Sequence, residues 1–108
     1  MSEITFLYVT TPNAEIAARI ARALVEERLV ACANILAEMR SVYRWEGKVE
    51  IGTETPVIFK TTTEGAAAAR NRIIALHPHE VPCVVALPID RKQSNAGFLD
   101  WIVQSVEG

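Results

Sequence analysis

The stretch Val42-Tyr43-Arg44-Trp45-Glu46-Gly47-Lys48-Val49 predicts a β-hairpin near the middle of the chain. Strand-forming aromatic and β-branched residues lie on both sides of a Glu-Gly pair, and Gly47 can take the positive φ that a tight turn needs. Glu46 suits such a turn less well than Asn or Asp, so a type I turn with Gly47 in a bulge and a type I′ turn both remain open. Residues 30–45 and 48–61 would form the two arms of this hairpin.

Both arms are longer than an ordinary strand, so we expect an interruption in each. The first arm should bulge or break near residues 36–38, because most strands have only about five or six residues. Gly52 and Pro56 lie inside the second arm and predict a bend or an edge irregularity, because proline cannot donate to a central ladder. Two such arms would form the middle of a sheet that the rest of the chain must cover.

The segments outside the hairpin alternate between strand and helix patterns. Residues 4–10 and 81–87 are apolar runs typical of strands, while residues 15–28, capped by Asn13, and residues 64–76 favour helices. A short terminal helix is predicted around residues 98–103. The order predicts an α+β, ferredoxin-like βαββαβ sandwich with a short C-terminal helix and strands in the order 4-1-3-2. Its helices would cover one face of the sheet, and oligomerisation would cover the other.

Length and composition indicate a single domain over residues 1–108, with half of its residues apolar. The formal net charge is −2 and no basic run occurs, which argues against nucleic-acid or anionic-membrane partners. No apolar run approaches the roughly 20 residues of a membrane span, and the first residues lack a signal-peptide pattern. We therefore expect a soluble, cytoplasmic protein. Cys32 and Cys83 would lie on opposite sheet edges, too far apart for a disulfide.

Six ordered motifs, spread over nearly the whole chain, resemble those of the CutA family of divalent-ion-tolerance proteins. They are VTTP at 9–12, LVACANI at 29–35, SVYRWEGK at 41–48, KT at 60–61, HPHEVP at 77–82 and LDWI at 99–102. The resemblance implies a ferredoxin-like homotrimer similar to the PII signalling proteins, with hairpins that reach between subunits. It also implies a link to tolerance of copper and other divalent cations, but no reaction. His79 and Phe98 depart from the family pattern, which usually has tyrosine at the first position and often at the second.

A metal site is the first functional candidate. The available soft or borderline ligands are Cys32, His77, His79, Glu80 and Cys83, and a thiolate with imidazoles suits copper or zinc. Cys32 matches the family cysteine that the resemblance associates with copper. No three ligands have the short spacing of a preformed site. We therefore expect no tightly bound cofactor, and weak or intersubunit binding of copper or another divalent cation by Cys32, His77 and His79. Alternatively, residues 77–79 are a helix stop with surface imidazoles.

A small-molecule pocket is the second candidate. Aromatic and charged side chains are combined in Tyr43, Trp45, Glu54, Lys60, His77 and Trp101. In a family-like trimer, the hairpin of one subunit should approach the second helix and C-terminus of another, forming a cleft. The alternative function is therefore a PII-like module that binds a small molecule between subunits; a structural hub is a third.

Two further observations bear on the role of Lys60 and on catalysis. Lys60 lies on an apolar strand, and an ion pair with Glu54 or Glu46 at an interface is the simplest explanation. The sequence has no phosphate loop, serine elbow or zinc-protease motif, so we expect no enzymatic activity.

Overall fold

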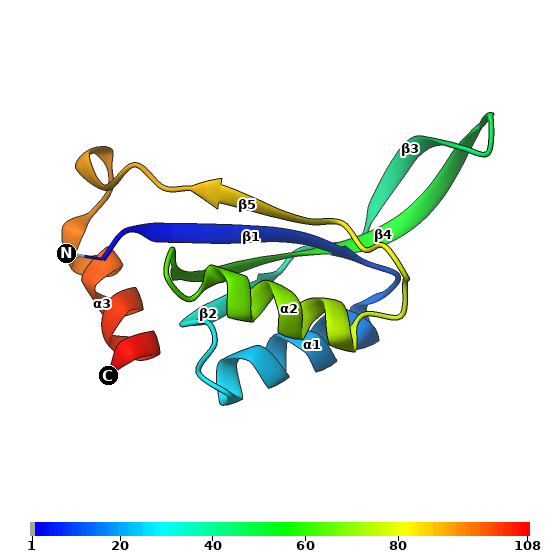
Figure 1. The fold of residues 1–108 in the computed structure, drawn as a ribbon. Coiled ribbons are helices and arrows are strands. Elements are labelled where there is room, and N and C mark those ends of the chain that lie inside the picture. The colour runs from blue at the N-terminus through cyan, green and yellow to red at the C-terminus, as the bar shows by residue number, and fades with distance from the viewer. Residues whose placement is uncertain (1) are drawn as a thin grey trace.

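The computed structural model describes residues 2–108 and confirms the α+β, ferredoxin-like architecture. Two helices, α1 and α2, lie on one face of the sheet, and a long hairpin rises from the sheet's far end (Figure 1). The elements in chain order are β1 (Ile4–Thr11), α1 (Ala14–Glu26), β2 (Cys32–Ile35), β3 (Met39–Trp45), β4 (Lys48–Thr62), α2 (Ala66–Leu76), β5 (Val84–Pro88), the 3-10 turn η1 (Arg91–Gln93) and α3 (Ala96–Glu107). Among the helices of this part of the chain, none is both long and apolar enough to cross a membrane.

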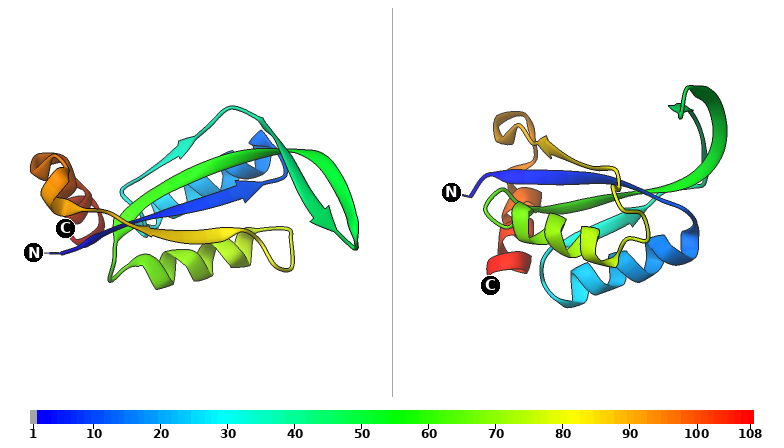
Figure 2. Two further views of the ribbon diagram at one scale, coloured as in Figure 1. Left: turned by 90° about the horizontal axis from the view of Figure 1, so that it is seen from above. Right: turned by 45° about the vertical axis from the view of Figure 1, so that its right-hand side comes forward.

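The sheet has the predicted strand order, with β4 as its central strand. The path is β2-β4-β1-β5, all pairs are antiparallel, and β3 pairs with the outer half of β4. β4 continues unbroken through all 15 of its residues, but it curves where the hairpin leaves the sheet, in agreement with the bend predicted for this arm (Figure 2). The Pro56 carbonyl accepts the Leu36 N–H at 2.9 Å. In a strand, the nitrogen and the carbonyl of one residue point to the same side, so the Pro56 nitrogen also points toward residues 36–38. β2 has ended there, and no N–H from Pro56 is needed for the ladder.

The predicted break in the first arm is a bulge that separates β2 from β3. Ile35 pairs with Val57 whereas Met39 pairs with Glu54, so residues 36–38 lie opposite residues 55–56 only. The extra residue on one side of the ladder reverses the alternation of side chains along that arm. As a result, Met39 and every second residue after it lie on the sheet face away from α1 and α2.

The hairpin closes with a two-residue turn, because Trp45 pairs directly with Lys48. Both central residues have positive φ, 48° at Glu46 and 80° at Gly47. Positive φ at both positions identifies a type I′ turn and decides between the two predicted alternatives. The left-handed conformation of Glu46 costs about 1–2 kcal/mol, which the pairing of the arms must offset.

Side-chain caps and turns set the limits of α1 and α2. The Asn13 side chain accepts the Ile16 N–H at 2.9 Å, which confirms the predicted cap of α1. α2 begins later than predicted because the Thr62 hydroxyl accepts the Gly65 N–H at 3.0 Å and holds residues 63–65 in a turn. The helix ends just before Pro78, as predicted, because proline disfavours helical geometry in the residue that precedes it.

The C-terminal elements also differ in extent from the prediction. β5 begins at Val84 rather than at residue 81, because Pro82 has no N–H to contribute to the ladder. α3 is longer than predicted and is capped by Asn95, whose side chain accepts the N–H groups of Gly97 and Phe98 at 3.0 and 3.4 Å.

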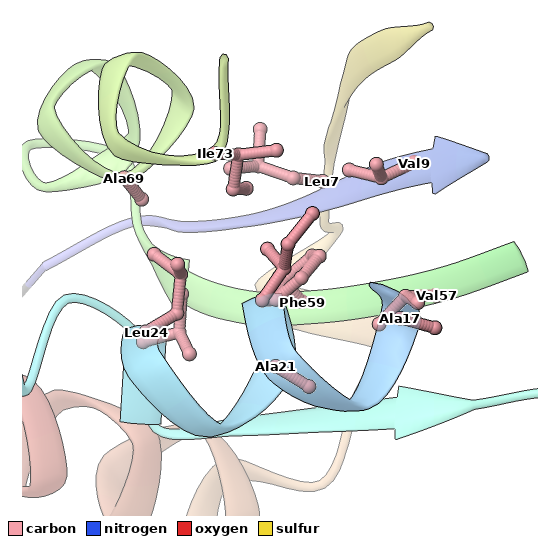
Figure 3. Close-up of a cluster of buried hydrophobic side chains, with 11 residues drawn as sticks. Leu7, Val9, Ala17, Ala21, Leu24, Val57, Phe59, Ala69 and Ile73 are labelled. Carbon is pink, nitrogen blue, oxygen red and sulfur yellow. The ribbon is translucent and has the colours of Figure 1, made fainter. Parts of the chain in front are cut away.

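The main core lies between the sheet and the two helices. Phe59 of β4 is fully buried there, with Val57 beside it, Leu24 from α1 and Ile73 from α2 (Figure 3). Burial of each large side chain of this kind contributes about 1.5–3 kcal/mol. The same cluster also contains Leu7, Val9, Ala17, Ile20, Ala21, Val30 and Ala69.

The opposite face of the sheet is covered only at one end. There Ile4 packs against Leu99 and Ile102 of α3 in a small second cluster. Figure 2 (left) shows the molecule from this side, with α3 confined to the end near the N-terminus. We call the remainder of this surface the open face. Its side chains include Phe6, Tyr8, Ile58, Val85 and Leu87.

Adjacent isoleucines on α2 test the position of the core. Ile73 is fully buried and Ile74 is 41% exposed. We expect Ile73→Ala to lower the free energy of unfolding by about 2–5 kcal/mol, because it leaves a cavity against Phe59. Ile74→Ala, the matched control, should cost less than about 1 kcal/mol. Urea unfolding at one fixed protein concentration measures both, and equal losses would contradict the proposed packing of α2.

Candidate functional site

A cavity of about 950 Å3 lies between the base of the hairpin and the loop of residues 77–83 that joins α2 to β5. The hairpin forms one wall, and the loop forms the other. β1 contributes Tyr8 and Thr10 between them. The hairpin wall includes Met39, Ser41, Tyr43, Trp45, Gly52 and Glu54, and the loop wall includes His79, Glu80, Val81 and Cys83.

The bulge before β3 determines which side chains form the hairpin wall. It turns Tyr43 and Trp45 toward the face that also carries Tyr8. The Tyr43 ring lies against the backbone at Gly52, where a Cβ would stand only 3.4 Å from the tyrosine oxygen. The Tyr8 hydroxyl donates to the Met39 sulfur at 3.9 Å. These contacts give the cavity an aromatic wall, to which Ser41 and Glu54 add polar groups.

His77 holds the loop wall in place from beneath. Its side chain is buried, and its Nδ1 accepts the N–H of His79 at 3.1 Å. Its Nε2 lies 2.8 Å from the Thr10 carbonyl, which can only accept, so Nε2 carries the proton of a neutral ring. The Thr10 N–H in turn donates to the Cys83 carbonyl at 3.3 Å. The imidazole thus ties the start of the loop to the end of β1, and the Thr10 N–H ties the other end of the loop to the same residue.

The structure brings together only part of the predicted small-molecule pocket. Tyr43, Trp45 and Glu54 line the cavity, and His77 lies below it. Lys60 and Trp101 lie elsewhere, toward the α3 end of the sheet. Six residues separate Glu54 from Lys60 along an extended strand, which is about 20 Å.

Within its own subunit, Lys60 has two aromatic neighbours. Its Nζ lies 5.3 Å from the centre of the Phe6 ring and 5.2 Å from that of Phe98. Trp101 stacks on Phe98 with ring centres 5.6 Å apart. No ion pair with Glu54 or Glu46 forms within residues 2–108. Cation–π contacts therefore stabilise the lysine on this half-buried surface.

The three predicted metal ligands do not converge within one subunit. His77 and His79 are close, with ring centres 4.9 Å apart. Cys32 lies far from the loop, at the start of β2, where it pairs with Lys60 of β4. Partial burial raises the pKa of the Cys32 thiol, and the positive charge of Lys60 offsets this effect only in part. Cys32 therefore holds less of the metal-binding thiolate than an exposed cysteine would at the same pH. Across the described chain there is no group of three or more His, Cys, Asp or Glu residues that could hold a metal.

Sequence reasoning missed Tyr8 and Met39 and considered Glu80 and Cys83 only as metal ligands. All four line the cavity. The missing information was the register, because pairing of β1 with β5 is what brings the Cys83 backbone against Thr10. An apolar run predicts a strand but not which of its residues lies opposite which partner.

Residues 5–105 match the family described as CutA1 divalent ion tolerance protein. The chain is 44% identical over 102 residues to the Divalent-cation tolerance protein CutA of Archaeoglobus fulgidus, covering 94% of this chain and 97% of the relative. Human Protein CutA is 38% identical over 104 residues, or 96% of this chain and 57% of the human protein.

Solved structures show the same fold. The divalent ion tolerance protein CutA1 from Ehrlichia chaffeensis superposes with a TM-score of 0.93 at 37% identity, over 100% of this chain and 99% of that one. The PII-like protein CutA from a Nostoc species gives a TM-score of 0.88 at 33% identity, over 95% of this chain and 97% of that one. The structure of the periplasmic divalent cation tolerance protein CutA from Archaeoglobus fulgidus gives a TM-score of 0.90 at 43% identity. The match covers 96% of this chain and 99% of that one.

The two histidines of the loop should differ sharply in their effect on stability. His77→Leu leaves the Thr10 carbonyl and the His79 N–H without their partner, so we expect a loss of about 1–3 kcal/mol in unfolding free energy. His79→Leu, the control, should stay within about 0.5 kcal/mol because that ring is exposed. Amide hydrogen exchange at residue 79 should also accelerate in the first variant. Equal effects of the two substitutions would contradict the role given to His77.

Proposed function

Because the chain belongs to the CutA1 divalent ion tolerance protein family, we propose that it is a non-catalytic homotrimer that acts in tolerance of divalent cations. The observation that carries this proposal is the open face of the sheet, which needs a cover that residues 2–108 do not supply. The number three comes from the family resemblance. The free cysteines Cys32 and Cys83 suit the reducing cytoplasm, where we place the protein.

The open face has the composition of an interface between subunits. Val85 and Leu87 of β5 are 48% and 43% exposed in the single chain, next to the half-buried Phe6 and Ile58. Contiguous apolar surface of this kind usually marks a contact with another protein. The projecting hairpin adds more exposed apolar side chains, namely Val42, Val49 and Ile51. These three side chains lie on the other side of the hairpin from the open face, so burying them needs a second contact with a neighbouring subunit.

We propose that the trimer binds copper or another divalent cation weakly, with Cys32, His77 and His79 as the candidate residues. Within one subunit Cys32 is distant from the histidines, so a shared ion requires donors from different subunits. Both ring nitrogens of His77 already have partners, so this residue would act by positioning His79. The raised pKa of the Cys32 thiol predicts that affinity increases with pH, because the thiolate is the ligand.

The alternative is a PII-like module that binds a small molecule, and the cavity beside the hairpin favours it. The volume of about 950 Å3 lies within the range of small-molecule sites, about 300–1,000 Å3. Tyr43, Trp45 and Glu54 supply aromatic surface and one charge. In an assembled protein, a neighbouring subunit would close the cavity further.

One charge on the open face tests the assembly. Val85→Asp should convert the trimer to smaller species at micromolar concentration, because the interface would bury an unpaired carboxylate. Val25→Asp is the matched control: Val25 is 40% exposed on α1, on the other side of the molecule, and the variant should remain trimeric. Sedimentation velocity distinguishes these species. A wild-type monomer, or an unaltered trimer in Val85→Asp, would contradict the proposed interface.

Zinc titration tests the metal proposal. We expect Cys32→Ser, His77→Ala and His79→Ala each to weaken Zn²⁺ binding by at least about tenfold. Cys83→Ser should bind zinc like the wild type, and wild-type affinity should rise between neutral and alkaline pH. Isothermal titration calorimetry with the assembled protein measures this, and equal affinities in all variants would exclude specific binding at these residues.

A further inference from the structure

The side chains that line the cavity beside the hairpin include two carboxylates, Glu54 and Glu80, and no lysine or arginine. Neither carboxylate takes part in an ion pair or a side-chain hydrogen bond with any other residue in the 2–108 range. The electrostatic potential inside therefore favours a cation over an anion.

The remainder of the lining suits an organic cation. Tyr8, Tyr43 and Trp45 all line the cavity, and aromatic rings attract ammonium and guanidinium groups through their faces. The Tyr43 ring lies over Gly52 of the neighbouring strand, so it borders the cavity with its edge against β4. Three aromatic side chains and two free carboxylates are thus gathered around one volume.

The size and the ligand geometry argue against a bare metal ion at this place. The cavity holds about 950 Å3, which is far more than one ion fills. No set of three His, Cys, Asp or Glu side chains in the described part of the chain is arranged to hold a metal. A ligand with an apolar body and a positive end would use both the aromatic wall and the carboxylates.

We propose that this cavity binds a small organic molecule with an ammonium or guanidinium group, held by Glu54, Glu80 and the rings of Tyr8, Tyr43 and Trp45. The inference deepens the small-molecule alternative described above by naming the chemical class of the ligand. It does not depend on the metal, and every group that it uses belongs to one subunit. Tyr8 also lies on the open face, so in the proposed trimer a neighbouring subunit would border the cavity.

Two probes of nearly the same shape, one charged and one neutral, measure how much the positive charge contributes to binding. Butylguanidinium is a cation, and butylurea is its neutral counterpart. The fluorescence of Trp45 reports binding in a Trp101→Phe background, since these are the protein's two tryptophans. We expect saturable binding of butylguanidinium with a Kd of about 10 mM or tighter, and binding of butylurea at least about tenfold weaker. Equal binding of the two probes, or no saturable binding of the cation, would overturn the proposal.

Charge-neutralising variants locate the site. Glu54→Gln and Glu80→Gln should each weaken butylguanidinium binding by about threefold or more, and the double variant by about tenfold. Glu64→Gln is the matched control, because Glu64 is an exposed carboxylate in the turn before α2, outside the lining, and its affinity should be unchanged. Wild-type affinity in both Glu54→Gln and Glu80→Gln would contradict the site.

Sedimentation of the same samples separates this inference from the proposed assembly. A monomeric wild type that binds butylguanidinium would contradict the trimer and support the cation site. A trimer that binds neither probe would contradict the cation site alone. Thermal melts of each variant, monitored by circular dichroism, show whether a loss of binding comes from unfolding, and a folded variant with lost binding supports the assignment.

Discussion

The long central strand β4 is the constraint on which the rest of the structure depends. It pairs with β1, β2 and β3, so its register fixes the position of nearly every other element. One extra residue in the 36–38 segment shifts the register between β2 and β3 and reverses the side-chain alternation. Without that shift, Tyr43 and Trp45 would point to the opposite side of the hairpin, and the aromatic wall of the cavity would not exist. Backbone pairing, rather than any single side-chain contact, creates the candidate site.

The same alternation gives β4 two different faces. Val57 and Phe59 point into the core under the helices, while Ile58 and Lys60 point to the open face. A sheet with two apolar faces is stable only if both are covered, and the helices cover one. Lys60 between two aromatic rings shows how a charge is accommodated on such a surface. Assembly and ligand binding are thus linked in this account, since the open face and the cavity lie on the same side of the sheet.

Much of the fold follows from local pattern. Alternation and helical periodicity predict the element order and the strand order, and the length of the first arm predicts its break. The turn type was open because Glu46 is an unusual residue for a left-handed position. The site was less predictable, because His77 was assessed by residue type, whereas its role depends on two backbone partners far apart in sequence. Cys32 and Lys60 were grouped with residues that the register places at the other end of the sheet.

The central claim is that the open face is buried between copies of this chain. Small-angle X-ray scattering of the wild-type protein at micromolar concentration tests it most directly. A single chain has a radius of gyration of 14.6 Å. We expect a scattering mass of three chains and a radius of gyration of about 20 Å, as a compact trimer of this length requires. A radius close to that of the single chain, with the mass of one chain, would contradict it.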